Sequence, residues 1–288
     1  MPTTVLEVLR KTTEYFAARG LDSPRLDAEV LLAHRLGCRR LDLYLQHDRP
    51  LAEPELVPLR DAVRERGRGV PVAYLTGTKE FYALPFAVTR DVLVPRPETE
   101  GVVEAAVEAL ADAASPVVAD VGTGSGCIAV ALLVERPDAR ALAGDVSAPA
   151  LAVARANAAR HGVADRLETR EGAGLSPWRD HAAWGRLAAV VSNPPYIVRG
   201  DPTVEPGVAA HEPALALYVD GDDPLAVAAA VATQACEALA PGGFLAVEVG
   251  AGSGAAAHTL LERLGYVGVV VRPDGAGIPR VACGRRPG

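Results

Sequence analysis

Aromatic residues and cysteines are scarce in this chain, and their scarcity narrows the class of protein. Phe, Trp and Tyr make up 5% of the 288 residues, so a core must be built mainly from aliphatic side chains and alanine. The cysteines lie far apart with no C-x-x-C pair, and no histidine stands in an H-E-x-x-H pattern. We therefore expect no metal centre and no redox pair, with the cysteines packed as small apolar residues.

Long hydrophobic runs and an excess of positive charge are also missing. No apolar segment has the roughly 20 residues that span a bilayer, and the N-terminus lacks the basic and apolar regions of a secretory signal. We expect a cytoplasmic protein without membrane association. The net charge of −7 disfavours a nucleic-acid partner, which needs a concentrated basic surface. The one basic cluster, "RDAVRERGRG", is typical of a solvated helix face.

Helical patterns dominate the first 72 residues. Apolar spacing predicts helices within residues 4–20, 23–37 and 52–69, and in the second of these Pro24 suits the first turn and Gly37 the stop. We expect a small all-helical N-terminal domain at residues 1–72. Residues 73–95 are rich in β-branched and aromatic residues with turn signals, which predicts a hairpin linker.

Residues 96–288 follow a different rhythm of strand, glycine-rich turn and helix. The first such unit is "PVVADVGTGSGCIAVALLVERPDA", and later units repeat the order. Alternation of this kind predicts an α/β domain with a doubly wound, mostly parallel sheet. Ligands of such sheets bind at the carboxyl ends of the strands.

The glycine-rich loop "DVGTGSG" follows the first of these predicted strands. Its G-x-G-x-G spacing is not the dinucleotide fingerprint, and it lacks the Lys-Ser/Thr pair of a phosphate loop. Asp145 ends the next predicted strand, where an acid can bind both hydroxyls of a ribose; its alternative role is to cap the following helix. Asp120 suits an amino group. S-adenosylmethionine combines an ammonium group and a ribose without a pyrophosphate.

The stretch "NPPY" at residues 193–196 follows a later apolar strand, "LAAVVS". An amide nitrogen is a poor nucleophile, and two hydrogen-bond acceptors on its N–H groups favour the positive charge that develops during methyl transfer. The Asn193 side chain offers one acceptor and the backbone carbonyl of Pro194 the other. Pro195 restricts Pro194 and so fixes that carbonyl, and Tyr196 can lie against a planar acceptor. The alternative is a rigid strand exit without chemistry.

Together, "DVGTGSG", "GDVS" and "VSNPPYI" resemble class I S-adenosylmethionine-dependent methyltransferases that act on planar nitrogen. With "PVAYLTGTKEF", "VPRPETE" and "HEPALAL", the chain is similar over nearly its whole length to the peptide chain release factor N5-glutamine methyltransferases. The resemblance implies a Rossmann-like fold, S-adenosylmethionine as methyl donor and S-adenosylhomocysteine as product. It also implies that the acceptor is the glutamine of the Gly-Gly-Gln loop of release factors.

The resemblance further implies roles for individual residues. The implied cofactor contacts are Asp120, Gly122, Thr123, Gly124, Ser125, Gly126, Asp145 and Asn193. The implied catalytic residues are Asn193, Pro194, Pro195 and Tyr196. The implied substrate contacts are those same four residues together with Arg96, Glu98 and Thr99. The N-terminal helices would help to dock the release factor on a monomeric enzyme with no nucleic-acid partner.

Two stretches depart from the family's pattern, and other acceptors stay open. Ala173 and Gly174 stand where the family usually has an acid and a bulky residue near the adenine, and residues 278–280 replace the usual pair near the C-terminus. The same chemistry on a small-molecule amide or guanidine is one alternative. An adenine N6-methyltransferase, which needs a base-flipping surface, and a non-catalytic cofactor-binding protein are others. Residues 199–211 are expected to form a substrate lid.

Overall fold

The computed structural model describes residues 3–288, which divide into two compact units. One unit holds the chain up to Thr78 together with Thr203–His211. The other holds Lys79–Pro202 and Glu212–Gly288. The predicted boundaries at residues 72 and 95 stay predictions.

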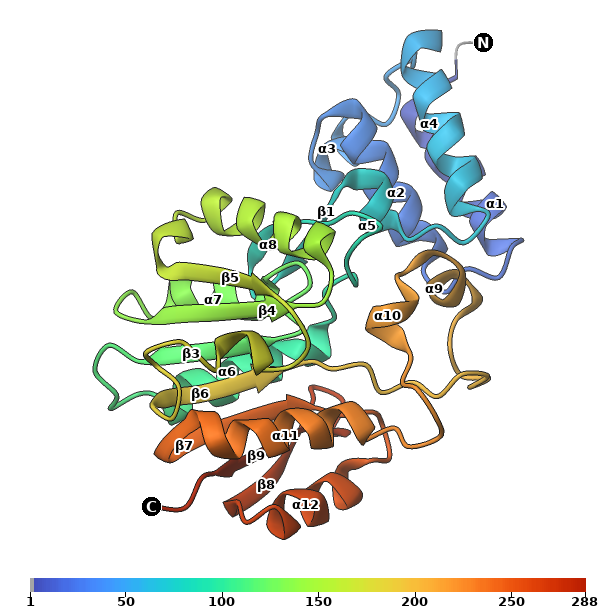
Figure 1. Cartoon of the computed structure of the whole chain (residues 1–288). Helices are drawn as coiled ribbons and strands as arrows, with labels where there is room; N and C mark the ends of the chain where they lie inside the picture. Colours follow the sequence, from blue (N-terminus) through green and yellow to red (C-terminus); the bar gives the residue numbers. More distant parts are fainter. Residues whose placement is uncertain (1–2) are drawn as a thin grey trace. The chain divides into compact units, whose positions relative to one another are not determined.

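Helices form the first unit, as the sequence pattern indicates (Figure 1). Thr4 caps the first helix by accepting a hydrogen bond from the Glu7 N–H, and Gly37 ends the second in the left-handed region at φ 62°. The short third and fifth helices were not expected from the sequence, and the fifth lies where the predicted hairpin linker begins. The helices are α1 (Val5–Ala17), α2 (Pro24–Leu36), α3 (Arg40–Leu45), α4 (Glu53–Arg66) and α5 (Val72–Thr76).

The late segment of this unit, α9 (Pro206–His211), packs against the turn after α4. A Cβ on Gly207 would lie 2.5 Å from the carbonyl oxygen of Gly69, so only glycine permits this approach. The His211 ring nitrogen Nε2 lies 3.2 Å from the carbonyl oxygen of Arg68. Residues 203–211, expected as part of a substrate lid, are thus packed into the first unit.

The expected hairpin forms from β1 (Thr78–Phe81) and β2 (Leu84–Ala87). Its tight turn places Tyr82 and Ala83 at positive φ, and the Tyr82 N–H donates to Glu100 Oε1 at 2.7 Å. Asn157 of α8 (Ala148–Arg160) exchanges two hydrogen bonds with the backbone of Ala87, at 2.7 and 3.0 Å. The second strand is therefore tied to the second unit.

The second unit is built on a seven-stranded sheet of order β5-β4-β3-β6-β7-β9-β8. The first five strands in this order run parallel, and β9 is antiparallel to both of its neighbours. The strands are β3 (Val117–Val121), β4 (Arg140–Asp145), β5 (Leu167–Glu171), β6 (Leu187–Ser192), β7 (Leu239–Glu248), β8 (Val267–Pro273) and β9 (Pro279–Arg285). This arrangement confirms the predicted doubly wound, mostly parallel sheet.

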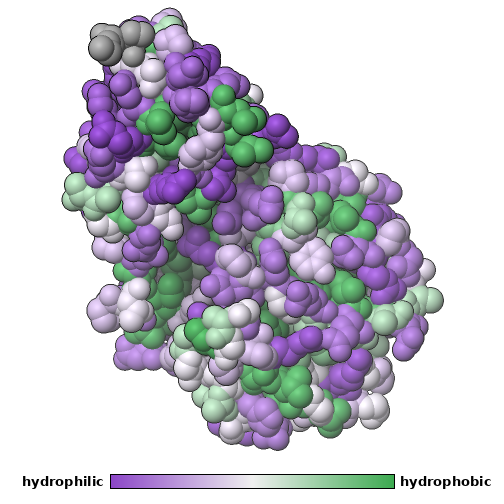
Figure 2. All heavy atoms as spheres, turned by 180° about the vertical axis from the view of Figure 1, so that it is seen from behind, coloured by the Kyte–Doolittle hydropathy of each residue, from purple (hydrophilic) through white to green (hydrophobic). Residues whose placement is uncertain are grey.

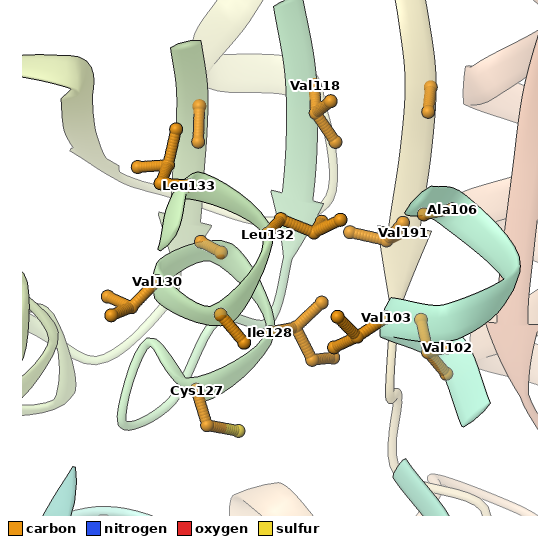
Figure 3. Packing of buried hydrophobic residues seen from close by; sticks show 14 of the residues in the cluster. Val102, Val103, Ala106, Val118, Cys127, Ile128, Val130, Leu132, Leu133 and Val191 are labelled. Atoms are coloured by element: carbon orange, nitrogen blue, oxygen red, sulfur yellow. The ribbon is translucent and has the colours of Figure 1, made fainter. Parts of the chain in front are cut away.

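Helices cover both faces of the sheet, because alternate strand residues point to opposite sides. On one face lie α6 (Glu100–Ala109), α7 (Cys127–Glu135) and α8 (Ala148–Arg160), and on the other α11 (Ala226–Ala238) and α12 (Gly254–Arg263). Figure 3 shows Ile128 and Leu132 of α7 and Val103 of α6 on the face that also holds Val118 and Val191. Aliphatic side chains thus form most of this core.

The surface in Figure 2 carries apolar side chains in small patches separated by polar ones. No helix within residues 3–288 is long and apolar enough to cross a bilayer. Shorter elements of the second unit complete the connections: η1 (Pro97–Thr99), η2 (Ala164–Arg166), η3 (Ser176–Trp178) and α10 (Ala214–Leu217).

Candidate active site

A cavity of about 490 Å³ opens in the second unit at the carboxyl ends of the parallel strands. The loops after β3, β4, β5 and β6 all contribute to its lining, and α11 closes one side. Strand order reverses between β3 and β6, which is where doubly wound sheets bind their ligands. Its volume falls within the usual range of small-molecule sites.

The loop after β3 turns through glycines at positive φ. Gly122 and Gly126 have φ of 70° and 79°, and the N–H groups of Gly122 and Thr123 both donate to the Gly144 carbonyl, at 2.8 and 3.0 Å. A Cβ on Gly126 would lie 3.0 Å from the Cβ of Ala154. The glycines therefore bring the loop close to β4 and α8, and Gly122 and Gly124 present no side chain to the cavity that they line.

Asp145 lines the cavity and also holds the loop. The Gly124 N–H donates to its Oδ2 and the Ser147 N–H to its Oδ1, both at 2.9 Å. The cap of α8 is Ser147, whose hydroxyl accepts from the Ala150 N–H at 3.2 Å. Asp145 is therefore not the cap of that helix, and each carboxylate oxygen keeps a further lone pair for a ligand.

Asp120 lies beneath the loop and does not line the cavity, in contrast to the contact expected of it. Its Oδ2 accepts from the Thr123 hydroxyl at 2.7 Å and from the Ala129 N–H at 3.2 Å. Its Oδ1 is buried with no hydrogen-bond partner among residues 3–288. Burial raises the pKa of this carboxyl to about 7. Asp120 is thus placed to support the loop, and a bound cation nearby would stabilise its charged form.

Arg96 reaches the cavity from the segment before η1. Its Nη2 lies 2.6 Å from Glu212 Oε1, and the Val94 N–H donates to Glu212 Oε2 at 2.9 Å. The Glu212 side chain is only 1% exposed. A buried carboxylate from a distant segment therefore fixes the Arg96 guanidinium, and sequence reasoning gave Glu212 no role.

Asn193 directly follows β6 at the cavity wall and joins a chain of buried and partly buried hydrogen bonds. Its Nδ2 donates to the Thr99 hydroxyl at 2.9 Å, and that hydroxyl donates to Glu248 Oε2 at 2.6 Å. The Tyr196 hydroxyl lies 3.4 Å from Glu248 Oε1. Burial is the main cause that raises the pKa of Glu248 to about 7 and that of Tyr196 to about 12.

The structure brings most of the expected residues to one cavity and leaves four outside its lining. Tyr196 packs its ring beside Gly250, where a Cβ would lie 3.1 Å from Cδ2. Those that line the cavity are Arg96, Thr99, Gly122, Thr123, Gly124, Ser125, Asp145, Asn193, Pro194 and Pro195. Those outside its lining are Glu98, Asp120, Gly126 and Tyr196.

Each of the two stretches that depart from the family's pattern lies beside a residue that the sequence did not single out, Gln234 for the first and Asp274 for the second. Ala173 and Gly174 line the cavity together with Gln234 of α11, whose Oε1 accepts from the Leu175 N–H at 2.6 Å. A Cβ on Gly174 would collide with the Gln234 side chain. Gln234 therefore occupies space that a larger residue at 174 would need.

Near the C-terminus, Arg280 pairs with Asp274 at 3.3 Å. Both partners are largely buried, and the backbone N–H groups of Ala276 and Ile278 donate to the same Asp274 carboxylate. An acid–arginine pair is thus present here, six residues apart. Within residues 3–288, no group of three or more His, Cys, Asp or Glu side chains could hold a metal ion.

Comparisons with known proteins agree with this geometry. Residues 7–77 match the PrmC N-terminal domain, and residues 103–209 match the methyltransferase small domain. The structure of the N-terminal domain of human METTL16 in complex with SAH has a TM-score of 0.51 and 15% identity, covering 81% of this chain and 82% of that one. At this identity the likeness shows the fold alone.

Sequence relatives are closer. The release factor glutamine methyltransferase of Chlorobaculum tepidum is 46% identical over 90% of this chain and 89% of its own length. That of Burkholderia pseudomallei is 44% identical over 100% of this chain and 98% of its own. The chain therefore belongs to the release factor glutamine methyltransferase family.

Proposed function

We propose that the protein transfers a methyl group from S-adenosylmethionine to the side-chain amide nitrogen of the glutamine in the Gly-Gly-Gln loop of release factors. One observation carries the proposal: the glycine loop with Asp145 and the Asn193–Pro195 segment share a single cavity. A methyl donor and an amide acceptor bound there would meet, which supplies proximity. The products would be the methylated glutamine and S-adenosylhomocysteine.

The residues of the cavity fit S-adenosylmethionine, which supplies a methyl group on a sulfonium. Asp145 has lone pairs free for the ribose hydroxyls after binding its own loop. The loop glycines leave space for close approach of the amino-acid part. The buried Asp120 carboxyl lies beneath the loop with Oδ1 unpartnered among residues 3–288, and the ammonium group of a bound S-adenosylmethionine would stabilise its charged form.

Asn193 and Pro194 orient the acceptor amide. The Asn193 NH₂ is engaged by Thr99, so its Oδ1 can accept one N–H of the glutamine. The Pro194 carbonyl, restricted by Pro195, can accept the other. Both contacts strengthen as positive charge develops on the nitrogen, so they stabilise the transition state more than the ground state. The extra proton then leaves the nitrogen for solvent.

We also propose that residues 1–72 form a docking domain, joined by residues 73–95 to a catalytic domain of residues 96–288. Leu41 and Leu45 of α3 are 62% and 69% exposed, which supports a protein partner for the first unit. We further propose that the enzyme is a monomer in the cytoplasm, where release factors act, and that it has no direct nucleic-acid partner.

Intact-mass analysis of a purified release factor tests the proposal. Incubation with the protein and S-adenosylmethionine should add one methyl group, located on the loop glutamine. Asn193→Ala and a release factor with that glutamine replaced should each abolish the addition. If S-adenosylmethionine binds but no methyl group is transferred, the release-factor assignment is wrong, and small-molecule amides and nucleic acid become the acceptors to test.

A further inference from the structure

Glu248 is a buried carboxylate at the end of β7, and the proposed methyl transfer does not assign it a role. It is 1% exposed and lies next to the cavity without lining it. Its closest partner is the Thr99 hydroxyl, at 2.6 Å from Oε2. Burying a carboxylate is unfavourable unless it is well hydrogen-bonded, so its position calls for an explanation.

The direction of the hydrogen bonds follows from the single proton of the Thr99 hydroxyl. A separation of 2.6 Å from a carboxylate oxygen is typical of a charge-assisted bond in which the hydroxyl donates. With its proton committed to Glu248, the Thr99 oxygen can only accept from Asn193. The Asn193 side chain must therefore turn its NH₂ toward Thr99, at 2.9 Å.

This direction matters because the two ends of an asparagine amide have nearly the same shape. Rotating the Asn193 amide by a half turn would exchange its oxygen and its NH₂ at almost no steric cost. The NH₂ would then meet the N–H of an acceptor amide, donor against donor. A group outside the cavity is needed to exclude that orientation.

We infer that Glu248 is a positioning residue that acts through Thr99 to keep the Asn193 carbonyl oxygen directed at the acceptor amide. Its relevance to catalysis rests on the proposed function, whereas the orientation itself does not. Glu248 does not line the cavity, and we do not expect it to contact the reacting atoms.

The groups around Glu248 set the pH range in which this hydrogen-bond direction holds, because the direction requires an ionised carboxylate. Burial raises its pKa to about 7, Arg280 lowers it and Glu98 raises it. Once protonated, the carboxyl can donate to Thr99, and the hydroxyl is then free to donate to the Asn193 oxygen. The polar groups that face Glu248 come from η1, the segment after β6, β9 and α7: Glu98, Thr99, Tyr196, Arg280 and Cys127.

The chain contains two asparagines, which makes the Asn193 amide directly observable. Protein labelled with ¹⁵N-asparagine should give two side-chain NH₂ pairs. Asn157 is an internal control, because its Nδ2 donates to the carbonyls of Ala87 and Ser125 at 3.0 and 2.8 Å. Thr99→Val and Glu248→Met should move the Asn193 signals and speed their exchange with water about tenfold, while Asn157 stays unchanged.

Kinetic measurements on Thr99 variants then distinguish the effect of its hydroxyl on the orientation of Asn193 from the effect of its side-chain shape on packing. Thr99→Val preserves shape but not the hydroxyl, and Thr99→Ser preserves the hydroxyl but not shape. We expect Thr99→Val to lower kcat about tenfold, the effect of one misdirected hydrogen bond, with the Kd of S-adenosylmethionine within about twofold of wild type. Thr99→Ser should restore most of kcat. Adding Glu248→Met to Thr99→Val should lower kcat no further.

Two results would overturn the inference: Asn193 signals that do not move in Thr99→Val and Glu248→Met, or kcat losses that add in the double variant. Should Glu248→Met not fold, the Val and Ser variants of Thr99 decide between the two explanations. If the wild-type protein methylates no release factor, the proposed function fails, and the Asn193 signals still decide the orientation.

Discussion

The Asp145 carboxylate holds its own loop and faces the cavity at the same time. Both oxygens accept backbone N–H groups, from Gly124 and Ser147. Because an ionised carboxylate has about four acceptor positions, two remain for a ligand. A single residue thus links the shape of the glycine loop to recognition of the ligand.

Replacing Asp145 with asparagine should weaken the binding of S-adenosylmethionine about 30-fold, near 2 kcal/mol. The amide NH₂ would oppose the N–H of either Gly124 or Ser147, and the ribose would lose an acceptor. Isothermal titration calorimetry measures the effect, with Asp112→Asn as an exposed control. Equal Kd values for the two variants would contradict the role of Asp145.

Two buried carboxyl groups should make stability fall as the pH rises toward 7. Burial raises the pKa of Asp120 and of Glu248 to about 7 in the folded protein, whereas unfolded carboxyls titrate near 4. Between these values the folded state binds protons that the unfolded state has released. The contribution of these two groups to the free energy of unfolding is therefore fully present below pH about 4. It is lost as the pH rises to about 7, by at most about 1.4 kcal/mol per pH unit for each group.

Urea unfolding of the wild type and Glu248→Gln between pH 5 and 8 measures this loss. The variant should show a shallower decline in the free energy of unfolding, because one of the two titrating groups is gone. Asp112→Asn serves as the exposed control. Parallel curves for the wild type and Glu248→Gln would show that Glu248 does not titrate in this range.

At the level of the elements, the glycine loop sets the distance between α7 and α8. Gly122 and Gly126 both have a positive φ. A Cβ at Gly122 would meet no atom of residues 3–288 within 4 Å, whereas a Cβ at Gly126 would meet Ala154 at 3.0 Å. Gly122→Ala should therefore cost only the left-handed strain, about 1–2 kcal/mol. Gly126→Ala should cost about 1–3 kcal/mol more, because α8 must move.

Urea denaturation of the two alanine variants against the wild type separates strain from packing. Both substitutions add the same methyl group to the same type of backbone conformation, so their difference isolates the contact with Ala154. Equal losses in the two variants would mean that α7 and α8 are not held at this distance by the loop.

The site segments at the ends of strands could be predicted from the sequence, whereas the side-chain contacts between distant segments could not. The glycine loop and the Asn193–Tyr196 segment are recognisable because each carries its chemistry in consecutive residues. The roles of Glu248 and Glu212 could not be predicted, because their hydrogen-bond partners are distant in sequence. Thr99 lies 149 residues from Glu248, and Val94 lies 118 residues from Glu212. An acid inside the apolar run "FLAVEVG" was the one local signal for Glu248. The fold class, which follows from repeating local patterns, was predicted.

For the molecule as a whole, the main departure from expectation is the route of the chain. Residues 203–211 return to the first unit, although they follow the Asn193 segment in sequence. The contact that holds them is a backbone approach between Gly69 and Gly207. No pattern in residues 199–211 predicts this contact, because glycine permits the close backbone approach only by lacking a side chain.

Gly207→Val should release α9 from the first unit, since a Cβ would lie 2.5 Å from the Gly69 carbonyl oxygen. We expect trypsin to cut after Arg199 about tenfold faster, because cleavage follows the population of the opened segment. Gly275→Val is the matched control, because a Cβ there meets no atom of the described part of the chain within 4 Å. The same rate of cleavage after Arg199 in both variants would argue against the anchoring of α9.

The return of residues 203–211 also affects the order in which the protein is completed during translation. Well over a hundred residues separate Thr78 from Thr203, which at bacterial and eukaryotic rates of synthesis takes on the order of ten seconds. Throughout that interval the nascent N-terminal helices lack α9, and the backbone beside Gly69 is uncovered. Synthesis of the first unit therefore begins first but is completed late, after β6 and the Asn193 segment that follows it have left the ribosome.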